Sequence, residues 1–389
     1  MSNMGAIPTQ RADDGRDGRF AFRQNEQRLV LSPDEWPEAS RSGRGALSGP
    51  PTRHKQSAAE EYRESSLRLL VDLRNAASDI QRDPKLRLNS DVLAAVSEHA
   101  TTFKARIKDY SPYHAILGVT SLAMIGYRDE DLFRRIHNRV KAGADTLSGS
   151  SIADLVWSCG ALMIHEPALL ETLKKSALRK ERVARMTDLD NPRNVIPFKE
   201  RALLAWGFAA ACPENNRQSY VKQIAHPQDL NREGAHFNHW HLMYQALVVA
   251  GLVDSKDSFP QLQSSDQQQD ERAPNSFETS VLNSAMTLLG EHRYPYYVRE
   301  QLGGVETDLM IVTPHGNVVI EADGEAFHRL IGPDGGMLRG KDQAQDRFLT
   351  KFGVKGVIHV GSWEWNPLHG EEILRHKINE VAPFLLDRP

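Results

Sequence analysis

The hydrophobic pattern of the chain changes near residue 274. Between residues 60 and 251, apolar side chains recur at helical spacing, as in 60–79 and 90–108, with Ser90 and Asp91 as candidate N-cap residues. Beyond that point, shorter apolar runs alternate with turns. The predicted helices there are 277–289, 340–352 and 371–385, and the predicted strands are 296–300, 306–312, 317–323 and 356–360. The pattern predicts a helical region followed by a small α/β domain.

Two stretches lack any periodicity. Residues 1–58 are rich in Gly, Ser, Pro, Arg and Asp, and they have too few apolar side chains to offset the entropy of ordering. Residues 253–273 are rich in Gln, Ser and Asp, as in a linker. We therefore predict a multidomain protein with a disordered N-terminus (1–58), a helical array (59–252), a linker (253–273) and a C-terminal domain (274–389).

The helical region contains an internal similarity. Ser111 matches Ser148, and Val119 matches Val156, each pair being separated by 37 residues. This offset lies in the range of helical solenoid repeats. Each unit consists of a core helix, a short break and an amphipathic helix, and a degenerate third unit follows residue 197. We predict an α-solenoid.

The best-defined signal in the C-terminal domain is a β-hairpin. The segment Pro314-His315-Gly316-Asn317 separates two apolar runs. Because side chains alternate along a strand, Glu321 and Asp323 share one face, and Asp308 lies on the neighbouring strand. We expect these three carboxylates to converge at one end of the sheet. The alternative is that they are separate, solvated strand-end acids.

Charge is distributed unevenly along the chain. The formal net charge is only −3, but residues 101–222 carry an excess of six basic residues (19 against 13), and residues 274–389 an excess of five acidic residues (16 against 11). A nucleic-acid surface would therefore be local. The candidate residues follow the core helices of the two clearest units and are Arg134, Arg135, Lys174, Lys175, Arg179 and Lys180. They would line one groove of stacked units, or they form an ordinary solvated face.

Composition adds two limits. The chain has no apolar run near the roughly 18 residues of a membrane span, so we expect no membrane association. The two cysteines, Cys159 and Cys212, lie in apolar helical segments and are expected to be buried, which fits a reducing compartment.

Several short motifs resemble the RAP domain, a C-terminal module of RNA-binding proteins. They are Asp308, the run Val319-Ile320-Glu321-Ala322-Asp323-Gly324, and Ser362-Trp363-Glu364-Trp365-Asn366; with Asn275-Ser276-Phe277-Glu278 upstream, the resemblance covers residues 275–389. The helical units before it resemble octotricopeptide-type repeats. The resemblance implies a restriction-endonuclease-like fold for the C-terminal domain.

In that fold, acids on the second and third strands hold a divalent cation that activates water. Asp308 and Glu321 match these positions, and Glu278 on the first helix offers a further acid. Asp323 stands where such nucleases carry a lysine, and His328 stands where repair-type relatives carry a histidine, so a histidine general acid or base is conceivable. The missing lysine counts against ordinary nuclease chemistry.

The two tryptophans of the last motif are candidates for base stacking. We predict that one of Trp363 and Trp365 is buried and that the other borders the acidic residues.

These observations favour an RNA-binding protein that grips single-stranded RNA through both regions and affects RNA processing, stability or translation. RNA binding would need no cofactor. One alternative is a metal-dependent endoribonuclease using Mg²⁺ or Mn²⁺ at Asp308 and Glu321. The other is a bacterial effector that contacts a protein partner in a host cell, since the Ser/Arg/Pro-rich leader resembles those exported by needle-type secretion systems. Otherwise the location would be the cytoplasm. The sequence leaves the oligomeric state and the target RNA open.

Overall fold

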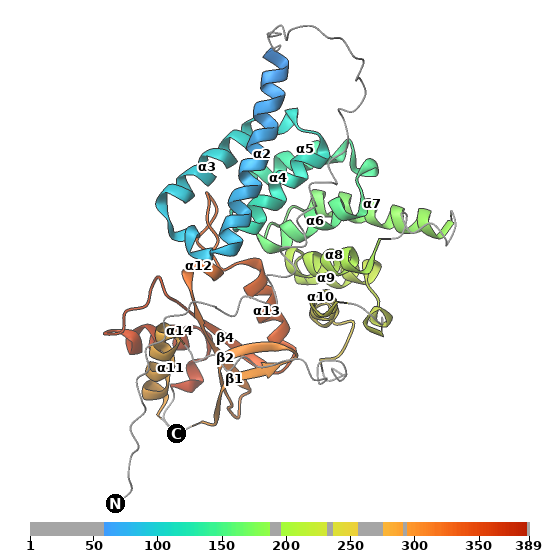
Figure 1. Ribbon diagram of the computed structural model, residues 1–389. Coiled ribbons are helices and arrows are strands. Elements are labelled where there is room, and N and C mark those ends of the chain that lie inside the picture. Colours follow the sequence, from blue (N-terminus) through green and yellow to red (C-terminus); the bar gives the residue numbers. More distant parts are fainter. Residues whose placement is uncertain (1–57, 187–195, 232–235, 256–274, 291–293, 387–389) are drawn as a thin grey trace, which may run out of the picture.

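A computed structural model describes residues 58–186, 196–231, 236–255, 275–290 and 294–386. The predicted leader, apart from residue 58, lies outside the described residues, as does most of the predicted linker. The described chain is mainly helical, with a small mixed sheet near the C-terminus (Figure 1).

The helical region begins with α2 and ends with α10. Its helices are α2 (Ala58–Arg82), α3 (Ser90–Ala105), α4 (Pro112–Ile125), α5 (Glu130–Lys141), α6 (Gly149–Ala161), α7 (Pro167–Met186), α8 (Phe198–Ala211), α9 (Glu214–Ile224) and α10 (Phe237–Val249), with short 3₁₀ turns that include η2 (Pro84–Leu88) and η4 (Ala144–Thr146). Helices α2, α4, α6, α8 and α10 pack against one another in succession, and α5 packs against α7 (Figure 1). The predicted N-cap of α3 is wrong by one residue, because the Asn89 side chain accepts the backbone N–H groups of Asp91 and Val92.

The two similar sequence units fold alike locally. Ser111 caps α4 by accepting the backbone N–H of His114 (3.2 Å), and Ser148 caps α6 by accepting that of Ser151 (3.1 Å). Both helices are apolar on nearly every side and are almost wholly buried. Helices α6 and α8 approach closely at Gly207, where a Cβ would lie 2.5 Å from the Val156 carbonyl oxygen.

The C-terminal region contains one four-stranded sheet in the order β1-β2-β3-β4. The strands are β1 (Tyr296–Leu302), β2 (Val305–Ile311), β3 (Asn317–Asp323) and β4 (Val354–Gly361), and the helices are α11 (Ser276–Leu289), α12 (Glu325–His328), α13 (Gly340–Thr350) and α14 (Gly370–Val381). The first three strands pair antiparallel, and β4 is parallel to β3. The predicted hairpin and helices are confirmed within a few residues, but α12 was missed. Helices α11 and α14 cover one face, and α13 lies between the sheet and the helical region (Figure 1).

The two regions share one apolar core. Met310, Val319 and Phe348 belong to the same buried cluster as side chains of α2 to α10. The segment between α12 and α13 also pairs with the break after α4, where Arg128 N–H donates to the Ile331 carbonyl (2.7 Å) and Ile331 N–H donates to that of Gly126 (2.9 Å). The C-terminal region is therefore seated on the helical region.

Two smaller expectations bear on the core and on membranes. Cys159 and Cys212 are free and buried, as predicted. Within the described ranges, the longer helices are too polar, and the apolar ones too short, for a bilayer-spanning segment.

Candidate functional site

The predicted hairpin brings Asp308 and Glu321 together. The β2–β3 ladder pairs Leu309 with Ile320, and the next residues in register are Asp308 and Glu321. Both side chains lie on the sheet face that turns toward α13. One carboxylate oxygen of Asp308 accepts the backbone N–H of Ala322 (2.7 Å), which fixes this side chain across the end of β3.

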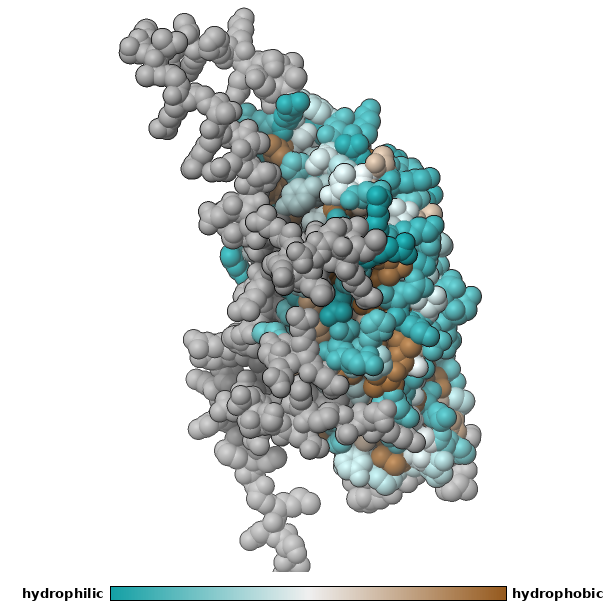
Figure 2. Space-filling view, turned by 90° about the vertical axis from the view of Figure 1, so that its right-hand side faces the viewer, coloured by the Kyte–Doolittle hydropathy of each residue, from teal (hydrophilic) through white to brown (hydrophobic). Residues whose placement is uncertain are grey.

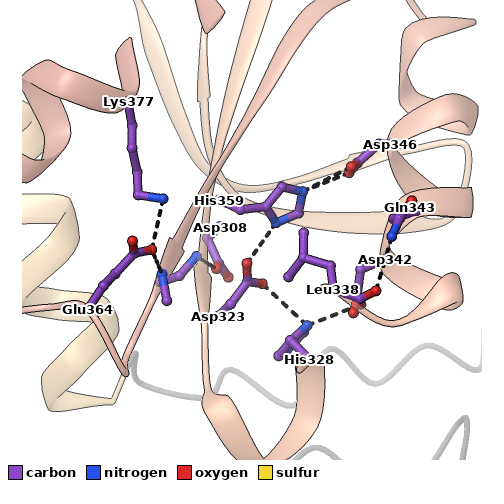
Figure 3. Close-up of polar contacts among 12 residues, drawn as sticks. Asp308, Asp323, His328, Leu338, Asp342, Gln343, Asp346, His359, Glu364 and Lys377 are labelled. Atoms are coloured by element: carbon purple, nitrogen blue, oxygen red, sulfur yellow. Dashed lines mark hydrogen bonds and ion pairs between the residues drawn. The ribbon is translucent and has the colours of Figure 1, made fainter. Parts of the chain in front are cut away.

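Asp323 is the centre of a chain of alternating acids and histidines (Figure 3). Its Oδ2 lies 2.7 Å from Nδ1 of His359, and its Oδ1 lies 3.3 Å from Nδ1 of His328. The chain continues at both ends, from His359 Nε2 to Asp346 (3.0 Å) and from His328 Nδ1 to Asp342 (3.1 Å). We call Asp342, His328, Asp323, His359 and Asp346 the acid–histidine chain.

The geometry around His359 favours a doubly protonated ring. Each ring nitrogen faces a carboxylate, and a carboxylate can only accept. Burial alone would lower the pKa of His359, but the hydrogen bonds to Asp323 and Asp346 outweigh burial and raise it to about 10. His359 is therefore a fixed cation at neutral pH.

His328 is held differently from His359. Only its Nδ1 faces carboxylates, and the side chain is 32% exposed. Burial lowers the pKa of His328, but the charges of Asp342 and Asp323 outweigh this effect and raise it. Burial of Asp342 would raise the pKa of its carboxyl, yet the neighbouring His328 outweighs burial and lowers it. The two groups form an ion pair in which Asp342 is buried and His328 is partly exposed.

Asp308 and Glu321 lack such partners. Burial raises the pKa of Asp308 to about 6. The negative charges of nearby Glu278 and Asp323 raise this pKa further, whereas the hydrogen bond from the Ala322 N–H lowers it. Burial, reinforced by Asp308, raises the pKa of Glu321 well above its usual value. Oε1 of Glu321 is buried without a hydrogen-bond partner. An unpaired, buried carboxyl is costly unless it is protonated or meets a cation.

The donor set fits a divalent cation only in part. Asp308 and Glu321 offer two adjacent carboxylates and one unpartnered oxygen, whereas Asp323 is already held by two histidines. Among the described residues, no group of three or more His, Cys, Asp or Glu side chains is arranged to hold a metal ion. Two carboxylates would bind such a cation weakly.

The remaining acid predicted for this site has a structural partner. Glu278 forms a capping box with Asn275 at the start of α11, and it pairs with Arg299 (3.3 Å). Its negative charge raises the pKa of Asp308, but its carboxylate oxygens already accept hydrogen bonds at the N-terminus of α11.

The tryptophan prediction is wrong, because neither side chain is fully buried. The motif forms a turn after β4 rather than a strand, so strand alternation does not apply to it. Trp363 is half-buried beneath the guanidinium of Arg329 (5.5 Å from carbon to ring centroid). Trp365, also half-buried, donates to the Ser280 hydroxyl (3.2 Å) at α11.

The predicted basic residues divide into exposed and covered ones. Those with exposed side chains are Arg134 (66%), Arg135 (49%), Lys175 (74%) and Arg179 (64%). We call these four the basic strip, since α5 and α7 pack side by side. Lys174 is only 12% exposed and lies over the Tyr220 ring (4.1 Å), and Lys180 is half-buried.

Sequence reasoning missed His359, Asp342 and Asp346. A signal for His359 was present, because it alternates with the buried Ile358 and Val360 and so faces the same side of the sheet as Glu321, its partner in register. Asp342 and Asp346 are four residues apart and share one face of α13. Their contacts with His328 and His359 depend on how α13 packs against the sheet, and the hydrophobic periodicity of the sequence does not predict that packing.

No protein-family model matches the chain, and a search among curated proteins finds no significant match.

The charged state of His359 predicts a pH dependence of stability. Its pKa in the folded protein, about 10, is above the value of about 6.5 for an unfolded histidine. Its contribution is therefore complete below pH 6.5 and is lost as pH rises through 10. We expect the free energy of unfolding to fall between pH 7 and 10, and to fall less in His359→Gln. Urea unfolding at several pH values measures this difference. Parallel curves for the two proteins would contradict the assignment.

Proposed function

We propose that this protein binds single-stranded RNA through its helical region, with the C-terminal region as a RAP-like partner domain, and so affects RNA processing, stability or translation. The observation that carries the proposal is the basic strip on α5 and α7. Its four side chains are exposed on adjacent helices, where they can contact successive phosphates.

The acids near the basic strip do not cancel it. Asp131 lies 3.0 Å from Arg135 and 3.8 Å from Arg134, and Glu171 lies 3.6 Å from Lys175. Asp145 pairs with Arg179. Such exposed ion pairs contribute little to stability, so an RNA phosphate can compete for the cations. The described surface on the right-hand side of Figure 1 is largely hydrophilic, with small apolar patches (Figure 2). A hydrophilic surface suits phosphate binding better than an obligate protein interface.

The resemblance to the RAP domain supports the same proposal from the C-terminal side. The strand order, with a helical crossover from β3 to β4 through α13, agrees with a restriction-endonuclease-like core. The proposed array of helix pairs agrees with the equivalent serine caps of α4 and α6.

One observation favours a second candidate, a metal-dependent endoribonuclease. The unpartnered oxygen of Glu321 beside Asp308 is suited to a cation. When bound, Mg²⁺ or Mn²⁺ would polarise a phosphodiester and generate hydroxide. The chain's own groups would contribute two carboxylates to hold the ion and His328 to carry a proton. Asp323 is committed to its histidines, and no lysine stands in its place.

Incubating labelled single-stranded RNA with the protein and Mn²⁺ separates the two functions. We expect retarded RNA of unchanged length, with binding kept in Asp308→Asn and Glu321→Gln. Cleavage that requires Mn²⁺ and disappears in both variants would establish the endoribonuclease instead. Neither binding nor cleavage at low salt would refute both.

A further inference from the structure

The short helix α12, which ends at His328, is held by a residue near the other end of the described chain. Arg87 in η2 is only 2% exposed. Its Nη1 donates to the carbonyl of Ala326 (2.6 Å), and its Nη2 donates to that of Arg329. These two carbonyls lie on either side of His328. A planar guanidinium can hold both carbonyls at once, which fixes the backbone between them.

The helix that carries Asp342 is also seated on the helical region. Gly340, the first residue of α13, packs against the end of α6 so closely that a Cβ would lie 1.8 Å from the Gly160 carbonyl oxygen. Further along α13, Arg347 donates to the Ala210 carbonyl at the end of α8 (2.7 Å). The position of Asp342 therefore depends on α6 and α8.

We propose that the helical region completes the acid–histidine chain, with Arg87 as a positioning residue for His328 and the end of α6 as the seat of the helix that bears Asp342. The positions of His328 and Asp342, which lie 3.1 Å apart, are then both set by contacts with the helical region. The inference goes beyond RNA binding and holds whether or not the basic strip binds RNA.

The consequence is measurable on His328 itself. The charged groups that act most strongly on it are Asp323 from β3, and Asp342 and Lys341 from α13. These two carboxylates stabilise the imidazolium, and Lys341 opposes them. Asp308 on β2 also acts on His328, and the Arg87 guanidinium lies against the backbone on either side of it. Loss of the Arg87 cation would by itself raise the pKa of His328, so a lowered midpoint in Arg87→Ala reports the displaced carboxylates. A shift of α12 or α13 by an ångström weakens the attraction of both carboxylates, because coulombic energy and hydrogen bonding fall with distance.

The test is the titration of His328 in the full chain, followed by NMR of ¹³C-labelled histidine and assigned with His328→Gln. In Arg87→Ala, the midpoint is expected to fall toward about 6.5, the value of an unperturbed histidine. Lys85→Ala is the matched control, because Lys85 lies in the same 3₁₀ turn and is exposed. It should leave the midpoint unchanged.

A second variant keeps the proposal testable if Arg87→Ala does not fold. Gly340→Ala places a methyl group against α6 and should lower the same midpoint while leaving Arg87 intact. Because the Arg339 N–H donates to the His328 carbonyl (2.7 Å), this change acts on the end of α12 as well as on Asp342. Circular dichroism establishes that each variant is folded. An unchanged midpoint in a folded Arg87→Ala or Gly340→Ala protein would overturn the proposal. RNA affinity, measured in parallel, reports on the basic strip separately.

Discussion

Replacing Asp323 with Asn is expected to destabilise the protein by about 3–5 kcal/mol at pH 7, because removing one member of a buried charge network leaves its partners uncompensated. Asp323 is 2% exposed and contacts both histidines of the acid–histidine chain. An amide can satisfy a hydrogen bond, but it cannot balance the charge of His359. That ring would then have to lose its proton or remain charged with only Asp346 beside it.

Chemical unfolding of the wild type and Asp323→Asn measures this loss. Glu98→Gln is a suitable control, because Glu98 is exposed on α3 and its loss should cost less than about 0.5 kcal/mol. The pKa of His359 should fall in Asp323→Asn, which a purely steric defect would not produce. A loss below about 1 kcal/mol, with the His359 titration unchanged, would contradict the pairing described here.

The sequence predicted the elements of the sheet better than the contacts made by its site. Alternation along β3 and the turn before it placed Glu321 opposite Asp308, because both depend only on local register. The same reasoning grouped Asp323 with these acids and gave it no partner. Its partners come from α12 and β4, and the placement of α12 depends on Arg87, more than two hundred residues upstream in the sequence.

The predicted separation of the two regions shows a similar limit. A polar, aperiodic segment predicts a break in regular structure, but it says nothing about contacts between the regions on either side. The hydrophobic pattern gives no reason to single out Gly160 or Gly340. Their role follows from a backbone approach that leaves no room for a Cβ. Lys174 illustrates the same point for charge, since its position on α7 predicted exposure and packing over Tyr220 covers it.

Replacing all four residues of the basic strip with glutamine is expected to weaken RNA binding for every sequence tested. Each lost phosphate contact should reduce the slope of log affinity against log salt concentration by about 0.7, so four contacts would reduce it by about 2.8. The measurement is fluorescence anisotropy with two unrelated single-stranded RNAs over a range of salt concentrations. An equal loss for both RNAs identifies phosphate contacts, because base contacts would weaken one sequence more than the other.

Two controls make this result specific to the surface of α5 and α7. Lys174→Gln removes a cation of the same helix that is covered by Tyr220, and it should change the slope by less than one contact. Neutralising the acids that pair with the strip, by Asp131→Asn, Asp145→Asn and Glu171→Gln, should strengthen binding, because the freed cations no longer have competing partners. If the fourfold variant keeps both affinity and slope, RNA does not bind at the basic strip. If the neutralised-acid variant binds no better, these ion pairs do not compete with phosphate.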